Sequence, residues 1–197
     1  LHTHPKGLYI QPTFQNPTGV TLPLARRQAL IELAGKYELP IIEDDPYSQL
    51  RFEGVPLPSL LALESKRQQQ SEQGAQPYQG QVVQLNTFSK VLAPGLRVGW
   101  VVGPAPVIHK LVLAKQGADL HTATLNQMIT YELLSEGFLE EHLPLLRARY
   151  HQRRDTMLTA LAEYFPATAR WTYPQGGLFL WVTLPEGVDT TALLQDI

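Results

Sequence analysis

The chain has 197 residues, of which 44% are hydrophobic and 17% charged, and its formal net charge is −2. That composition can build a hydrophobic core, and the near-neutral charge gives no reason to expect nucleic acid or an anionic membrane as a partner. The absence of cysteine excludes disulfides, thiolate metal sites and a cysteine nucleophile. The six histidines are scattered, without the close spacing of a zinc motif, so we expect no metal site. No apolar run approaches the ~20 residues that cross a bilayer.

The first part of the chain alternates between apolar stretches and turn residues. Residues 7–11 have the character of a short strand. After a turn at residues 16–19, the pattern predicts a helix with Thr21 as its N-cap and Pro23 in its first turn. The apolar face of that helix is predicted to contain Leu30, Leu33, Ala34 and Tyr37.

Three more strands and two helices are predicted next. The strands are expected at residues 41–43, 81–86 and 98–103, and the helices at roughly 105–116 and 123–135. Short apolar strands that alternate with helices predict an α/β fold with a mostly parallel sheet, covered by helices on both faces. Residues 65–80 are polar and rich in glutamine, and we expect them to form a surface loop or a partly disordered insertion.

The C-terminal part has a different pattern. Residues 138–165 are typical of one long helix or two in series. Residues 169–173 and 178–183 alternate like two strands of a separate small sheet, and Asp189 is a good N-cap for a final helix. The basic residues of the long helical segment are expected on a solvated face: Arg147, Arg149, Arg153 and Arg154.

Two short polar clusters precede or follow predicted strands in the first part of the chain. The first, Asn16-Pro17-Thr18-Gly19, consists of turn formers and alone would indicate a plain loop. The second, residues 43–47 (Glu-Asp-Asp-Pro-Tyr), directly follows a strand. Acids at the carboxyl end of a parallel strand lie where α/β sheets bind ligands. A turn or a helix cap explains a lone Asp at such a position equally well.

A third cluster is the most informative. It contains Thr87, Ser89 and Lys90 after a predicted strand, and then Arg97 beyond a Pro-Gly turn that can fold the arginine back. Hydroxyls and a guanidinium suit a phosphate dianion. A Schiff-base lysine must lose its proton, which a cationic neighbour or partial burial favours, although a lone lysine after a strand is usually a surface charge. The fourth cluster, residues 174–181 with the pattern P-x-G-G-x-F-x-W, by itself indicates packing.

Together and in this order, the four clusters resemble the signature of fold-type I pyridoxal 5′-phosphate (PLP) enzymes, the class I and II aminotransferases. The nearest likeness is to the subgroup of 2-aminoadipate and aromatic aminotransferases and the aminotransferase-like half of MocR-type transcription regulators. The resemblance covers essentially the whole chain apart from the glutamine-rich segment, which is longer than expected of the family.

The resemblance implies roles for individual residues. Lys90 would bind the cofactor through a Schiff base and later move the proton at the substrate Cα. Asp44 would pair with the pyridine nitrogen, so that the ring acts as an electron sink. Asn16 and Tyr47 would hydrogen-bond the phenolic oxygen of the ring. The phosphate would be held by Thr87, Ser89 and Arg97.

The resemblance also implies a division of the chain. Residues 1–137 would be the C-terminal part of the large PLP-binding domain, and residues 138–197 a connecting helix with part of a small α+β domain. A phosphate loop and a ring-stacking aromatic would precede the chain, and the arginine that grips the substrate carboxylate would follow it. We therefore expect a piece cut at both ends. Arg51 and Arg170 are expected to be surface arginines rather than substitutes for that arginine.

The expected function is transfer of an amino group from an L-amino acid to a 2-oxo acid, in amino-acid biosynthesis, by a cytoplasmic homodimer. Aromatic, branched or 2-aminoadipate-like substrates are expected from the subgroup. Two alternatives stay open. One is a PLP- or amino-acid-sensing domain of a MocR-type regulator, which a helix-turn-helix domain upstream would favour. The other is an inactive truncated product.

Overall fold

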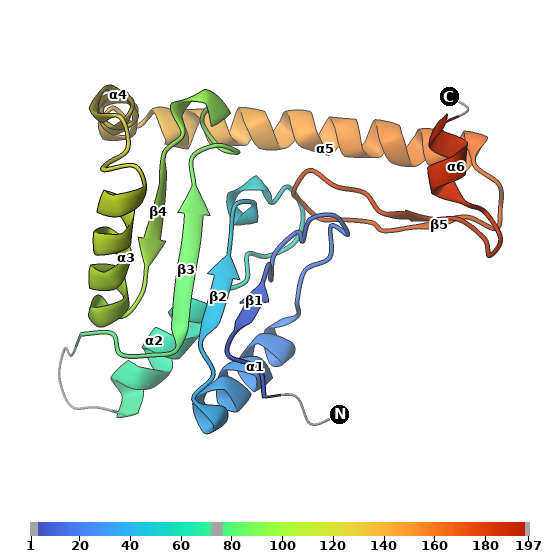
Figure 1. Ribbon diagram of the computed structural model, residues 1–197. Coiled ribbons are helices and arrows are strands. Elements are labelled where there is room, and N and C mark those ends of the chain that lie inside the picture. The colour runs from blue at the N-terminus through green and yellow to red at the C-terminus, as the bar shows by residue number, and fades with distance from the viewer. Residues whose placement is uncertain (1–3, 72–76, 196–197) are drawn as a thin grey trace.

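Four strands form the main sheet, and three of them are parallel. The computed structural model describes residues 4–71 and 77–195. The strands, which neighbour one another in chain order, are β1 (Leu8–Ile10), β2 (Ile41–Asp44), β3 (Val82–Thr87) and β4 (Gly99–Val102). The first three pair in parallel, and β4 runs antiparallel to β3 (Figure 1). The predicted mostly parallel sheet is confirmed, and each strand is found within one residue of its expected bounds.

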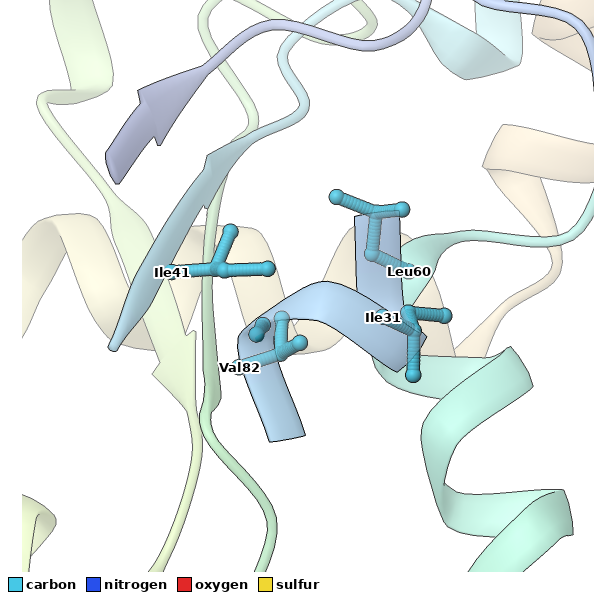
Figure 2. Packing of buried hydrophobic residues seen from close by; sticks show 5 residues of the cluster. Ile31, Ile41, Leu60 and Val82 are labelled. Atoms are coloured by element: carbon cyan, nitrogen blue, oxygen red, sulfur yellow. The ribbon is translucent and has the colours of Figure 1, made fainter. Parts of the chain in front are cut away.

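One face of the sheet is covered by α1 (Leu24–Tyr37) and α2 (Leu60–Ser71). Five side chains form a core cluster between these helices and the sheet, and each is at most 5% exposed. They are Ile31, Ala34, Ile41, Leu60 and Val82, and Figure 2 shows four of them converging from both helices and two strands. A fully buried aliphatic side chain of this size stabilises the fold by about 1.5–3 kcal/mol, so this cluster is a main source of stability.

The apolar face predicted for α1 is partly wrong. Ala34 is buried as expected, but Leu33 is 53% exposed and Tyr37 is 67% exposed. The helix instead turns Ile31 and Arg27 inward. A periodicity based on apolar residues alone could not assign an arginine to the buried side of a helix.

The start of α1 also differs from the prediction. Pro23, not Thr21, occupies the N-cap position, and no side chain caps the helix there. The Thr21 hydroxyl instead accepts a hydrogen bond from the Phe14 N–H group (3.3 Å). The neighbouring loop is held by Arg27, which is 1% exposed and donates to three backbone carbonyl groups. A buried guanidinium needs such partners because desolvation without them is costly.

The opposite face of the sheet is largely open, so the expectation of helices on both faces is wrong for the residues that the structure describes. Side chains alternate across a strand. Ile41 and Glu43 are therefore fully buried beneath the helices, whereas Ile42 between them is 42% exposed. On β4 the residue of this face is Val101, which pairs with Leu85 next to Asp44 and is 40% exposed. Apolar sheet surface of this kind is normally covered in proteins.

Residues 65–71 belong to α2, so the prediction of a loop is wrong for that part. The N-terminus of α2 is capped by the buried Glu43, whose carboxylate accepts the first two backbone N–H groups of the helix (2.8 and 3.0 Å). Glu64 accepts two backbone N–H groups at the start of β3 (3.1 Å). These tertiary contacts stabilise a polar helix that propensity alone would not sustain. Residues 72–76 lie outside the described residues.

A single long helix dominates the second half of the chain. After α3 (Ala105–Ala118) and α4 (Thr124–Ser135) comes α5 (Phe138–Tyr164), one helix where one or two were expected. It passes beyond the carboxyl ends of the three parallel strands (Figure 1) and contacts the 3₁₀ turn η1 (Ser48–Leu50). Arg147 donates to the Gln49 carbonyl there (2.7 Å). Within the described part of the chain, no helix is both long and apolar enough to span a membrane.

The last elements are of the predicted types, but the two strands are shorter than the expected ranges 169–173 and 178–183. The two-residue strands β5 (Arg170–Trp171) and β6 (Val182–Thr183) pair antiparallel, separately from the main sheet. Helix α6 (Thr190–Gln195) follows Asp189, whose Oδ1 accepts the Thr191 N–H group (2.9 Å). The predicted N-cap is therefore confirmed. The division into residues 1–137 and 138–197 stays a prediction.

The expectation that the basic residues of α5 all lie on a solvated face is wrong for Arg154. The Arg154 side chain is only 11% exposed and forms ion pairs with Glu53 and Asp155. Its guanidinium also lies over the Phe52 ring, 5.0 Å from the centroid. Arg154 therefore links α5 to the segment that follows η1, because charge and ring packing act on the same side chain.

Candidate functional site

The candidate residues gather at the edge of the sheet where the three parallel strands end. β2 ends at Asp44 and β3 at Thr87, while β1 ends one residue before Gln11. The parallel register aligns Ile10 with Glu43, so the strand ends meet at one edge (Figure 1). In open α/β sheets, ligands bind outside this edge.

The Asp44 carboxylate is held by two side chains from the β1 segment. Gln11 Nε2 donates to Asp44 Oδ2 (2.7 Å), and the Tyr9 hydroxyl donates to the same oxygen. The bond to Asp44 is the main reason that the pKa of Tyr9 is raised to about 12, so this hydroxyl keeps its proton at neutral pH. Among the described residues, no hydrogen-bond donor reaches Oδ1. The carboxylate is thus fixed through one oxygen and can accept another donor at the other.

Asn16 and Tyr47 lie together beside this carboxylate. The Asn16 N–H group donates to Gln11 Oε1 (2.9 Å), and the Asn16 side chain hydrogen-bonds Tyr47. The Asn16–Pro17 peptide bond is cis. Tyr47 is 4% exposed, and burial raises its pKa above the ordinary value of 10 although the bond to Asn16 opposes this shift. The phenol is therefore neutral at physiological pH and can donate a proton in a hydrogen bond.

Lys90 lies in the turn that follows β3. Thr87 Oγ1 accepts the backbone N–H group of Ser89 (3.1 Å), and the two hydroxyl oxygens lie 3.0 Å apart. Lys90 is partly buried, and its neighbour Val91 is only 4% exposed in a core cluster with Tyr47. The lysine backbone is therefore anchored on both sides, by hydroxyl bonds before it and by packing after it.

Arg97 follows the 3₁₀ turn η2 (Pro94–Leu96) and has a left-handed backbone (φ 53°). The next residue, Val98, accepts hydrogen bonds at its carbonyl from the Phe88 N–H group (3.1 Å) and the Thr87 hydroxyl (3.3 Å). The Pro-Gly turn thus returns the chain to the end of β3, in the way that the sequence suggested. The Arg97 guanidinium is exposed and donates to the Pro94 carbonyl (3.2 Å).

The fourth cluster packs against the first. A Cβ atom on Gly176 would lie 2.3 Å from the Phe14 ring, and one on Gly19 would lie 2.6 Å from the Phe179 carbonyl oxygen. The Phe179 ring also meets the Tyr47 ring edge-on, with centroids 5.6 Å apart. Packing was the role expected of this cluster, and the structure confirms it. The close approach requires glycine at positions 19 and 176.

The set of side chains suits PLP by its chemistry. It offers a primary amine (Lys90), a carboxylate with a free oxygen (Asp44), and neutral amide and phenol donors (Asn16 and Tyr47). Two hydroxyls and a guanidinium are available for a phosphate: Thr87, Ser89 and Arg97. Within the described residues, no group of three or more His, Asp or Glu side chains could hold a metal ion.

Two residues at this edge were not identified from the sequence, and one arginine was misjudged. Tyr9 and Gln11 carry no motif of their own, and only their alternation on one strand face could have indicated them. Arg51 is not a surface residue: it is 9% exposed, lies 4.6 Å from the Phe14 ring centroid and donates to Gln175 Oε1 (3.1 Å). Arg170 is exposed on β5, as expected.

Comparison with known proteins gives consistent results. The aromatic-amino-acid aminotransferase 1 of Thermococcus litoralis is 44% identical over 190 residues, which are 96% of this chain and 42% of that protein. An uncharacterized HTH-type transcriptional regulator of Bacillus subtilis is 36% identical over 96% of this chain and 37% of the regulator. Each relative is thus more than twice as long as the matched segment.

A solved structure of an aminotransferase is similar to the chain in both fold and sequence. LysN, an alpha-aminoadipate aminotransferase of Thermus thermophilus complexed with N-(5′-phosphopyridoxyl)-L-leucine, has a TM-score of 0.89 and 42% identity, over 98% of this chain and 47% of that one. Residues 3–196 match the family described as aminotransferase class I and II. Since the match spans nearly all of the sequence, the chain belongs to the PLP-dependent class I and II aminotransferase family.

Proposed function

We propose that the protein containing this chain is a PLP-dependent aminotransferase, which moves an amino group from an L-amino acid to a 2-oxo acid. The observation that carries the proposal is the common edge at which β2 and β3 end. Asp44 lies at that edge, and the turn that contains Lys90 begins there. A carboxylate and an amine are therefore available to one ligand. Membership of the family supports the reaction class.

The chemistry divides between the cofactor and the chain. PLP, when bound, supplies an electron sink for the charge that develops at the substrate Cα. Asp44 would accept the ring nitrogen's proton in a hydrogen bond at Oδ1, and an ion pair in a dry site keeps that nitrogen protonated. Lys90 would hold the cofactor covalently and, once free, carry the proton at the substrate Cα.

The remaining side chains would bind and orient the ring. Asn16 and Tyr47 are neutral donors for the phenolic oxygen, and the raised pKa of Tyr47 keeps its proton in place. The Thr87 and Ser89 hydroxyls would bind phosphate oxygens. Arg97 would turn from the Pro94 carbonyl to the phosphate, because a guanidinium binds a dianion more strongly than a neutral carbonyl.

The substrate class follows from the relatives. Their names include an aromatic-amino-acid aminotransferase and an alpha-aminoadipate aminotransferase, the latter complexed with an L-leucine adduct. We propose aromatic, branched or 2-aminoadipate-like amino acids as donors. A homodimer in the cytoplasm, acting in amino-acid biosynthesis, is proposed by analogy with the family.

A sensor function is the second candidate, because an HTH-type regulator is 36% identical to the chain. In such a protein, the same residues would bind PLP or an amino acid without turnover, and DNA binding would belong to another domain. An inactive truncated product is the third candidate.

One experiment separates these functions: a visible absorption spectrum of the longest natural form of the chain with added PLP. An aminotransferase should show a yellow band that is absent from Lys90→Ala and that bleaches when an amino acid is added. Lys110→Ala, on the exposed side of α3, is the matched control and should keep the band. A Lys90-dependent band that no amino acid bleaches would favour the sensor, and no band at all would favour the inactive product.

A further inference from the structure

A single amide joins two of the residues proposed to bind the cofactor ring. Gln11 Nε2 donates to Asp44 Oδ2 (2.7 Å), and Gln11 Oε1 accepts the backbone N–H group of Asn16 (2.9 Å). A carboxylate can only accept and a backbone N–H group can only donate. The two partners therefore determine which end of the amide faces which, and neither could be satisfied by the reversed amide.

Strand geometry makes this bridge possible. Gln11 directly follows β1, and the register of Ile10 with Glu43 brings it beside Asp44 at the end of β2. The chain then returns to Gln11 at Asn16, which lies in a turn closed by the Gly19 N–H group donating to the Gln15 carbonyl (2.6 Å). The amide thus connects a sheet strand to the Asn16 turn, which no backbone pairing joins directly.

Both hydrogen bonds to Asp44 fall on the same oxygen. The Tyr9 hydroxyl and Gln11 Nε2 donate to Oδ2, and their alternation along one strand face puts both side chains on the side of Asp44. Charge-assisted bonds of this kind are about twice as strong as neutral ones. They restrain the carboxylate while Oδ1 stays available.

We propose that Gln11 is a positioning residue for the cofactor ring, an inference that rests on the proposed function. Its amide sets the distance between two groups that would bind different atoms of the ring, the Asp44 carboxylate at the nitrogen and Asn16 at the phenolic oxygen. Gln11 itself touches neither atom. Its effect passes through Asp44 and Asn16, because the amide is the shared partner of both.

The first test is Gln11→Leu in the longest natural form of the chain, measured by PLP titration of the visible band. Loss of the bridge should raise the dissociation constant of PLP about tenfold, the scale of one charge-assisted hydrogen bond. The pH midpoint of the band should also shift, because the ring's protonation depends on Asp44. Gln28→Leu, a glutamine on the exposed side of α1, is the matched control and should change neither quantity.

The second test is Gln11→Glu, which keeps the length and the acceptor for Asn16 but replaces the donor to Asp44 by a carboxyl group. Two carboxyl groups in contact share a proton, so one of them titrates at a raised pKa. Below that pKa the protonated carboxyl donates to Asp44 as the amide does. PLP affinity should therefore return to within about threefold of wild type as pH falls from about 8 to 6, whereas Gln11→Leu should not recover.

The outcomes separate this inference from the proposed function. Wild type without a Lys90-dependent band overturns both. A wild-type band with Gln11→Leu binding PLP within twofold of wild type overturns only the role of Gln11. So does an equal loss in Gln11→Leu and Gln11→Glu at every pH, because a merely structural role would not depend on a shared proton. If thermal unfolding without PLP shows that Gln11→Leu is unfolded, the role of Gln11 is decided by whether the PLP affinity of Gln11→Glu recovers as the pH is lowered.

Discussion

The two faces of the main sheet differ in what covers them. On one face, Ile41 and Glu43 are fully buried beneath α1 and α2, and the aliphatic core lies there. On the other face, Ile42 is 42% exposed and Tyr9 is 59% exposed. Asp44, which the proposed function assigns to the cofactor, is held by side chains of this second face.

Along the short strand β2, residues that stabilise the fold therefore alternate with residues of the face on which the cofactor is proposed to bind. The side chains at positions 41 and 43 of β2 pack or cap, and those at 42 and 44 face the open side. Because alternation is strict in a strand, a single-residue step moves a substitution from one role to the other. Four substitutions, from the largest expected effect to the smallest, can break or sharpen that separation.

The largest effect is expected from Asp44→Asn, at the chemical end of the open face. An amide cannot carry the negative charge that keeps a ring nitrogen protonated, so transamination should fall by about 10²–10³-fold. Stability should change little, because the oxygen of the amide can still accept the hydrogen bonds from Tyr9 and Gln11. The check is kcat in the longest natural form, with Asp119→Asn at the exposed C-cap of α3 as control. Unchanged kcat would remove Asp44 from the proposed mechanism.

Ile41→Ala should be the most damaging change for stability. Ile41 is 0% exposed in the core cluster, and truncation of a buried aliphatic side chain costs about 2–5 kcal/mol. The free energy of unfolding, from urea denaturation of the 197-residue chain, measures this loss. A loss below about 1 kcal/mol would show that α1 and α2 do not close this face as tightly as the structure indicates.

Glu43→Gln should cost about 1–3 kcal/mol at pH 5, because the amide places an N–H donor where the second Glu43 oxygen accepts a backbone N–H group. Burial raises the pKa of Glu43 above its ordinary value of 4.5. A raised folded-state pKa means that the carboxyl favours folding most below pH 4.5, and that this contribution is lost as pH rises through the folded-state pKa.

The difference in unfolding free energy between wild type and Glu43→Gln should accordingly shrink from pH 5 to pH 8. Urea denaturation at both pH values tests the sign. Glu32→Gln on the exposed side of α1 controls for the loss of one charge. A difference that grows with pH would mean that the carboxylate is stabilised, not penalised, in the folded chain.

The smallest effect is expected from Ile42→Ala, the neighbour of Ile41 on the open face. A side chain that is 42% exposed loses little on truncation, so the chain should be destabilised by less than about 1 kcal/mol. The same change in the longest natural form sharpens the comparison. A cost of several kcal/mol there would show that another part of the protein covers this face.

Local patterns predicted the regular elements and the motifs well. The strands of the main sheet were found within one residue because short Val- and Ile-rich runs between turn formers have few alternatives. Asp189 was identified as an N-cap because its carboxylate accepts N–H groups only two and three residues further along the chain. The order Asn16, Asp44, Lys90 and Arg97 was enough to indicate a family, although the assigned roles stay predictions.

Patterns failed where distant partners decide. Residues 65–71 have the composition of a loop, yet they continue α2, whose first turn is capped by Glu43 and whose Glu64 caps the start of β3. Arg27 and Arg51 were treated as surface residues or not considered, yet both are buried by partners far along the chain. Charge and composition carry no information about such partners.

The sequence by itself determined the element order, the parallel strands and the chemical types that lie at their ends, because these follow from periodicity and from side-chain chemistry over a few residues. Only the tertiary structure decided which face of the sheet is buried and which residues hold Asp44. Gln11 reaches Asp44 across 33 positions, and no local pattern encodes a contact of that range. The free energy that selects it comes from pairing β1 with β2, which exists only once the sheet has formed.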